Sequence, residues 1–163
     1  MKKKTGPASL VAALVIGLCL HASSAMAEGS TPESVVKSFA KAYYMLDDTM
    51  ADYMSEEARV NENDVDMVDL FLRLKEDEAR KRGYDVTYLR MHPILMKTTV
   101  VEMNEDTAVV NLNTTALRNI NPLYRITGYI FGLMKEHEFN ATLSLVKEDG
   151  MWKVSPGALD PLR

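Results

Sequence analysis

The chain has 163 residues, of which 47% are hydrophobic and 26% charged, with one cysteine and a formal net charge of −4. This composition is ordinary for a compact soluble domain. It excludes a collagen-like protein, a disulfide-stapled miniprotein and a disordered acidic tail.

The first 27 residues have the three parts of a secretory signal peptide. Three lysines at residues 2–4 precede an apolar run at residues 10–20, and Ala25 and Ala27 are the small residues that a signal peptidase reads. The apolar run is well short of the roughly 20 residues that a spanning helix needs. We therefore expect residues 1–27 to be cleaved, residues 28–163 to form a single periplasmic domain, and no stable membrane anchor to remain.

Cleavage would change the charge and the cysteine content. It removes three lysines, no acidic residue and the single cysteine, which leaves 16 basic and 23 acidic residues and a net charge of −7. A chain without cysteine has no disulfide, thiol nucleophile or thiolate metal ligand. An acid excess also argues against binding to nucleic acid or to an anionic membrane surface, because neutralising phosphates needs clustered Lys and Arg.

Helices are predicted in the first half of the mature chain. Thr31 and Pro32 are typical of a helix start, and an apolar stripe with helical spacing follows them. A short second helix is predicted at about residues 50–54, and a third from about residue 63 to residue 82, where Gly83 would cap it in the left-handed conformation.

After Gly83 the apolar period changes to two, which predicts a sheet. A long strand is expected over residues 84–103 with a bulge or bend at Pro93, and others at residues 108–116, 139–145 and 151–155, the last two joined by a turn at Asp149-Gly150. The predicted fold class is therefore α+β, with N-terminal helices packed on a curved antiparallel four-stranded sheet.

Two segments carry a resemblance to a known family. Residues 31–43 followed by 52–58 are similar to the opening of small exported bacterial members of the nuclear transport factor 2-like (cystatin-like) superfamily, and residues 147–154 to their last hairpin. The resemblance spans residues 31–156 and implies a cone-shaped sheet with a pocket at its open end. Relatives often pair through the sheet face, which implies a homodimer. The superfamily hosts both enzymes and binding modules, so the resemblance does not choose a function.

An apolar segment at residues 122–134 interrupts the alternation and carries one charge, Arg125. It is too short to span a membrane. Four uses remain open: a flap over the cone mouth, a subunit contact, a patch for a partner or membrane surface, or a bulged strand pair buried against the helices.

The candidate pocket combines this segment with residues of the predicted helices and strands. His137 has the strand parity of Phe139 and so would face the core. The expected lining is Tyr43, Tyr88, Arg90, Tyr124, Tyr129, Phe131 and His137.

The sequence lacks the motifs of metalloproteases, nucleotide-binding loops and α/β-hydrolases. We therefore expect a non-enzymatic domain, without cofactor or metal, that holds a small hydrophobic ligand or docks a protein partner. The alternative is an isomerase- or dehydratase-like enzyme with His137 or a helix carboxylate as its base.

Overall fold

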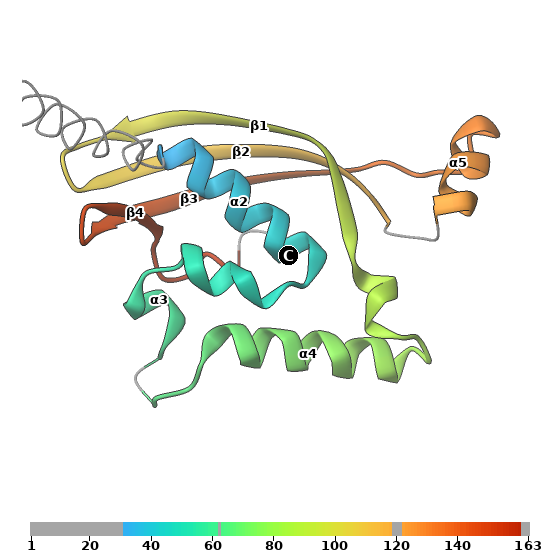
Figure 1. Ribbon diagram of the computed structural model, residues 1–163, viewed down its shortest axis with the longest axis horizontal. Coiled ribbons are helices and arrows are strands. Elements are labelled where there is room, and N and C mark those ends of the chain that lie inside the picture. Colours follow the sequence, from blue (N-terminus) through green and yellow to red (C-terminus); the bar gives the residue numbers. More distant parts are fainter. Residues whose placement is uncertain (1–30, 62, 119–121, 161–163) are drawn as a thin grey trace, which may run out of the picture.

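The computed structural model describes residues 31–61, 63–118 and 122–160. A layer of helices lies against one face of a four-stranded antiparallel sheet (Figure 1). The elements are α2 (Pro32–Met45), η1 (Asp48–Tyr53), α3 (Glu56–Arg59), α4 (Met67–Lys81), η2 (Val86–Leu89), β1 (Met91–Met103), β2 (Thr107–Arg118), α5 (Pro122–Ile130), β3 (His137–Glu148) and β4 (Met151–Val154). The predicted α+β class is confirmed. The expected signal peptide lies outside the described residues.

Helix α2 forms the centre of the helical layer. The Thr31 side chain accepts a hydrogen bond from the Ser34 N–H, and Pro32 occupies the first turn, as the sequence predicts. The apolar stripe of α2 is buried against the inner face of the sheet, and the helix ends at Leu46, whose φ is 51°. Phe39 and Val36, at 0% exposure, lie in the centre of the hydrophobic core.

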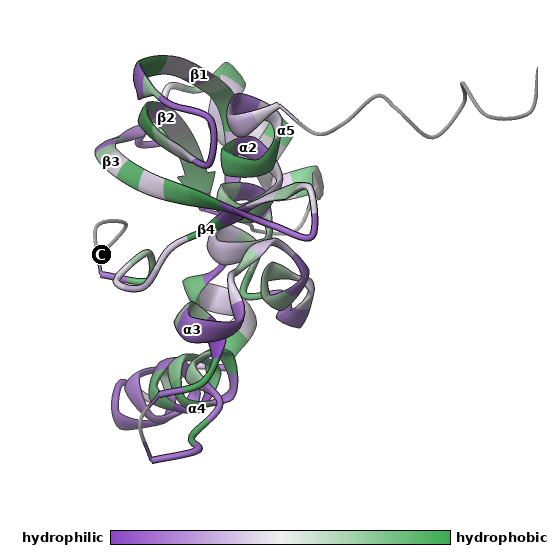
Figure 2. Ribbon diagram, turned by 90° about the vertical axis from the view of Figure 1, so that its left-hand side faces the viewer, coloured by the Kyte–Doolittle hydropathy of each residue, from purple (hydrophilic) through white to green (hydrophobic). Residues whose placement is uncertain are grey.

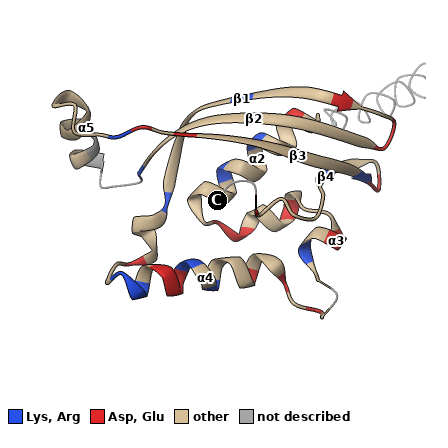
Figure 3. Ribbon diagram, turned by 180° about the vertical axis from the view of Figure 1, so that it is seen from behind, with Lys and Arg blue, Asp and Glu red and all other residues tan. Residues whose placement is uncertain are grey.

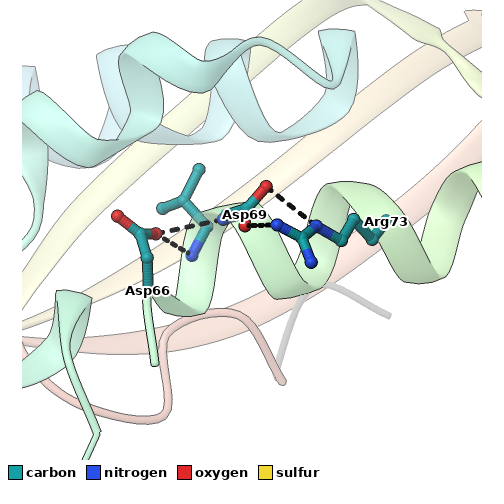
Figure 4. A network of polar contacts seen from close by, with 4 residues as sticks. Asp66, Asp69 and Arg73 are labelled. Carbon is teal, nitrogen blue, oxygen red and sulfur yellow. Dashed lines mark hydrogen bonds and ion pairs between the residues drawn. The ribbon is translucent and has the colours of Figure 1, made fainter. Parts of the chain in front are cut away.

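Helix α4 begins later than predicted because Asp66, rather than a residue near 63, caps it. The Asp66 carboxylate accepts hydrogen bonds from the N–H groups of Val68 (2.9 Å) and Asp69 (3.0 Å), and the Asp69 carboxylate pairs with Arg73 one turn on (Figure 4). Only part of this helix is buried, and hydrophobic and hydrophilic segments alternate along its ribbon (Figure 2).

The four strands form a meander in the order β1-β2-β3-β4. Inner-face residues of β2 and β3 pair with one another, as Val110 does with Leu143, and polar residues alternate with them on the outer face. The register of β1 shifts after Pro93, which confirms the predicted bulge. The turn at Asp149-Gly150 is also confirmed, with both residues at positive φ.

The last strand ties the sheet to the helices. Met54 forms a parallel bridge with Val154, and the Ser55 N–H donates to the Val154 carbonyl at 2.9 Å. The Lys153 ammonium donates to the Asp52 carbonyl at 2.5 Å. The segment between α2 and α4 is therefore held in place by the C-terminal end of the sheet.

Two local features differ from the predictions. Residues 86–89 form the 3₁₀ helix η2 rather than the start of a strand, because the Asp85 carboxylate caps them by accepting from the Thr87 N–H at 2.9 Å. The predicted short helix does end before Ser55, but Ser55 then caps a further short helix, α3, that was not predicted. Both are short helices that begin at a side-chain cap, and the spacing of apolar residues does not predict such caps.

Candidate ligand-binding site

A cleft opens where the C-terminal half of α2 faces α4, η2 and the ends of β1 and β3. Its volume is about 170 Å³. The lining is aromatic and aliphatic apart from one ion pair, and consists of Tyr43, Tyr44, Leu46, Phe71, Lys75, Glu78, Leu89, Met91 and Phe139. A cavity of about 150 Å³ lined by apolar groups holds one benzene ring, so this cleft has room for a ligand of that size.

Four rings form the wall of the cleft. Tyr43 stacks on Phe71 with centroids 4.8 Å apart, and Tyr44 lies edge-on to Tyr43 at 5.5 Å. Tyr44 also contacts Phe139 at 5.2 Å. The Tyr43 hydroxyl donates to the Leu159 carbonyl at 3.4 Å, which fixes the direction of its ring. These rings come from two helices and one strand, so the wall exists only in the folded protein.

Two buried hydroxyl groups lie behind this wall. The side-chain oxygens of Tyr44 and Thr114 are buried, and neither has a hydrogen-bond partner of good geometry. Burial raises the pKa of Tyr44 to about 12, and the neighbouring Thr114 hydroxyl offsets a small part of this rise. Buried polar groups without partners are rare in folded proteins.

The rim of the cleft is charged. The Glu78 carboxylate lies 3.0 Å from the Lys75 ammonium and 2.9 Å from the Arg82 guanidinium. The Lys75 hydrogen bond, more than the charges of Lys75 and Arg82, holds the pKa of Glu78 below its usual value. Glu78 is therefore an ionised, paired group, which is unsuited to moving protons as a general base.

Arg90 lies beside the cleft, next to two turns that each hold a carboxylate. Hydrogen bonds from Thr49 and Thr87 hold the pKa values of Asp47 and Asp85 below their usual range, and the positive charge of Arg90 adds a smaller lowering to both. The Nε atom of Arg90 is buried and has no hydrogen-bond partner. The cation is thus close to two acidic turns but keeps one unused donor.

The residues predicted for the pocket are divided between several places. Tyr43 lines the cleft, Arg90 lies beside it, and His137 is half-buried with its ring 6.4 Å from that of Phe139. His137 pairs with Ala116 on the inner face, as its parity predicts. Tyr88 is 53% exposed, and its ring lies 6.0 Å from the guanidinium carbon of Arg118.

The three residues predicted from the apolar segment do not line the cleft. Tyr124, Tyr129 and Phe131 belong to α5 and the turn after it and are 68%, 71% and 72% exposed. The reason is that α5 continues from the far ends of β2 and β3, beyond the helical layer (Figure 1). The flap over the cone mouth is therefore not the arrangement that the structure shows.

The sequence carried signals for two residues that our predicted pocket omits. Tyr44 follows Tyr43 at the buried end of α2. Thr114 occupies an inner position of β2 between Leu112 and Ala116, and a polar residue at such a position is the pattern that marks a site or a buried hydrogen bond. No comparable signal in the sequence pointed to Leu89 and Met91. They line the cleft in a structure where residues 86–89 form η2 instead of the predicted strand.

A second, open hollow lies on the outer face of the sheet. Its volume is about 550 Å³. The Asn113 amide donates to Asn140 at 2.6 Å, and the Thr142 hydroxyl donates to Asn111 at 2.7 Å. Around the hollow the outer face is thus polar and hydrogen-bonded within itself, and its exposed residues there are Lys97, Thr99, Asn111, Asn113, Asn140 and Thr142.

The solved structures include distant likenesses. A nuclear transport factor 2-like protein of unknown function from Shewanella oneidensis MR-1 has 13% sequence identity and a TM-score of 0.42, over 74% of this chain and 88% of that one. A Xanthomonas campestris protein, provisionally named as a calcium/calmodulin dependent protein kinase II association domain, has 14% identity and a TM-score of 0.40, over 97% of this chain and 96% of that one. The first carries the name of the superfamily that the sequence resembles. No family model and no curated protein matches the sequence.

Proposed function

We propose that this protein is an exported, non-enzymatic binding domain of the periplasm whose aromatic cleft holds a small hydrophobic ligand. The observation that carries this proposal is the cleft of about 170 Å³ with its wall of four rings. Its volume suits a single ring or a short branched chain rather than a drug-sized molecule, which needs about 300 Å³ or more. The periplasmic location is supported by the pattern of residues 1–27.

The rim defines the polar part of such a ligand. Lys75 and Glu78 are 28% and 34% exposed, and they are the charged side chains among the described lining residues. An apolar body would lie against Phe71 and Phe139, and one small hydroxyl or carbonyl group would remain at the mouth, where the ion pair can donate to it or accept from it.

The described residues favour binding over catalysis. Glu78 is held ionised by Lys75 and Arg82, and His137 is not among the described residues that line the cleft. An isomerase or dehydratase needs a base in contact with the bound molecule and an acid opposite it. The geometry of the cleft supports neither such a base nor such an acid.

Small phenols test the proposal directly. p-Cresol has one ring and one hydroxyl group, and toluene is its match without the hydroxyl. We expect p-cresol to shift the NMR signals of Phe71, Leu89 and Phe139 and to raise the melting temperature, with a smaller effect from toluene. Native mass spectrometry of the purified protein would show any ligand retained from the cell.

A cavity-filling variant makes this test specific. Leu89→Trp places a larger side chain in the cleft and should abolish the effect of p-cresol, whereas Val101→Trp, at an exposed position of β1, should preserve it. Unchanged spectra and melting temperature with both compounds would remove the support for a ligand cleft.

We also propose that two copies pair through the outer face of the sheet. The support is that this face is uncovered, because α2 and the elements after it up to η2 lie on the opposite side (Figure 1). Apart from Lys97, the exposed side chains around the hollow on this face are Thr and Asn, which are short, so a second sheet could approach it closely. This proposal is independent of the ligand cleft.

A further inference from the structure

Helix α5 and the turn after it expose an unusual amount of apolar surface. Gly128 is buried, and the Met134 side chain packs into the space that a Cβ atom at residue 128 would need. The large side chains around Gly128 face water. Their exposed fractions run from 58% to 79%, and the residues are Leu123, Tyr124, Ile126, Tyr129, Ile130, Phe131 and Leu133. We call these seven residues the α5 apolar tip.

The apolar tip extends around most of the helix. At 3.6 residues per turn, the positions of the tip residues that lie within α5 cover an arc of about 220°. The remaining arc holds positions 125 and 128. The stripe by which a surface helix packs on a protein core is about 100° or somewhat wider. A single flat partner would therefore leave part of this arc in water.

The exposed area is also larger than one contact requires. Seven side chains of this size and exposure present on the order of 1,000 Å². The largest apolar patch on a typical monomer is about 300–600 Å², and a standard interface buries about 800 Å² on each partner. An area of this size that wraps around a helix suits an environment that encloses the helix, such as the interfacial layer of a lipid bilayer.

The position and the charge of the tip suit the same environment. Helix α5 projects beyond the end of the sheet (Figure 3). The flanking charges are nearly balanced, with Arg118 and Lys135 close in sequence to Glu136 and Glu138. The acid excess of the chain therefore lies elsewhere. Two of the tip residues are tyrosines, which favour the boundary between headgroups and acyl chains.

We propose that the α5 apolar tip inserts into the surface of a lipid bilayer and attaches the protein to it reversibly. The helix would lie in the interfacial layer and not cross it, since its nine residues extend about 14 Å against a hydrocarbon core of about 30 Å. Among the described residues, no helix is long and apolar enough to span a membrane. The partner is thus a lipid surface, and the aromatic cleft plays no part in the contact.

A tryptophan at the tip reports its insertion in the full chain. In Phe131→Trp, the new indole should shift its emission to the blue on addition of phosphatidylcholine and phosphatidylethanolamine vesicles, and brominated phosphatidylcholine should quench it. Trp152 is 9% exposed and should contribute a constant background. Because the signal comes from residue 131, attachment through residues 10–20 alone would give no quenching by the brominated chains.

Paired aspartate substitutions distinguish binding through the tip from non-specific adsorption to vesicles. Ile126→Asp with Ile130→Asp should reduce binding of the chain from Glu28 onward to the same vesicles at least tenfold, because each carboxylate must leave water to insert. Ile94→Asp with Val101→Asp changes two comparably exposed residues on β1 and should leave binding unchanged. Circular dichroism confirms that each variant is folded.

Three outcomes would overturn the proposal. The first is no vesicle binding by the wild-type chain and no blue shift at residue 131. The second is equal loss of binding in both aspartate pairs. The third is a dimer in light scattering that the Ile126→Asp, Ile130→Asp pair dissociates, because a second copy would then cover the tip. Stronger binding when phosphatidylglycerol is added would support the proposal and assign part of the affinity to Arg118 and Lys135.

Discussion

The ring of Tyr44 on α2 lies 5.2 Å from the ring of Phe139 on β3, at a tilt of 38°. Phe139 is in turn the register partner of Thr114 on β2. This contact joins the helical layer to the sheet, forms part of the cleft wall and shields the two unpaired hydroxyl groups from water. The stability of the core and the properties of the cleft therefore depend on the same side chain.

Removal of the Tyr44 hydroxyl should cost little. Tyr44→Phe deletes a buried oxygen without a hydrogen-bond partner, so we expect a change in the free energy of unfolding between zero and a gain of about 1 kcal/mol. Tyr43→Phe is the matched control, because it deletes the bond to the Leu159 carbonyl and should cost about 1 kcal/mol. Urea unfolding measures both. A loss for Tyr44→Phe as large as that for Tyr43→Phe would show that the Tyr44 hydroxyl has a partner.

Stability should fall at high pH because of Tyr44. The folded protein keeps the Tyr44 proton up to a pKa of about 12, whereas the unfolded chain releases it near 10. Below pH 10 both states hold the proton and the residue adds no pH dependence. Between pH 10 and 12 the unfolded state binds fewer protons, so the free energy of unfolding falls as pH rises, by about 2–3 kcal/mol in total.

The pH effect is isolated by comparison with Tyr44→Phe. The difference in urea midpoint between wild type and variant should be constant up to pH 10 and then change steadily to pH 12, with the wild type losing stability faster. Parallel curves over the whole range would mean that Tyr44 titrates normally in the folded protein.

The cap of α4 should be worth more than an ion pair on its surface. Asp66→Ala removes the acceptor for the N–H groups of Val68 and Asp69 and should lower the free energy of unfolding by about 1 kcal/mol (Figure 4). Asp77→Ala removes an exposed partner of Arg80 in the same helix and should cost less than about 0.5 kcal/mol. Thermal unfolding followed at 222 nm would rank the two; the reverse order would contradict the assignment of the cap.

Pairing through the outer sheet face should be sensitive to charge. Thr99→Glu with Ser144→Glu introduces two acids on each copy, which would oppose two acids of the partner, and should convert a dimer to a monomer in light scattering. Lys41→Glu, on the exposed side of α2, also makes the chain more acidic and should leave the dimer intact. A wild-type protein that is monomeric at every concentration would contradict the pairing.

Most of the fold was predictable because its signals are local and repeated. The alternation along β2 and β3, the cap at Thr31 and the turn at Asp149-Gly150 each specify an element within a few residues, and all are confirmed. Residues 84–90 were not predictable in this way. Their alternation is typical of a strand, but the Asp85 side chain competes for the Thr87 N–H and bends the backbone into a 3₁₀ turn.

The candidate site was less predictable because its residues meet only through tertiary packing. Parity correctly placed His137 on the inner face, and the buried stripe of α2 pointed to Tyr43. The place of Phe71 opposite Tyr43 depends on how far α4 stands from α2, which no local pattern states. The apolar segment was identified as an anomaly. Its projection from the end of the sheet depends on the lengths of β2 and β3, which flank it.

The contacts between β4 and the segment after α2 determine when this fold can be completed. Lys153 and Asp52 lie 101 residues apart in sequence, and Ser55 is held by a residue of the last strand. A chain synthesised from its N-terminus can form α2 early, but it cannot fix the segment after α2 until its final strand has emerged. The domain therefore closes late, and the nascent chain stays open to chaperones for nearly its whole length.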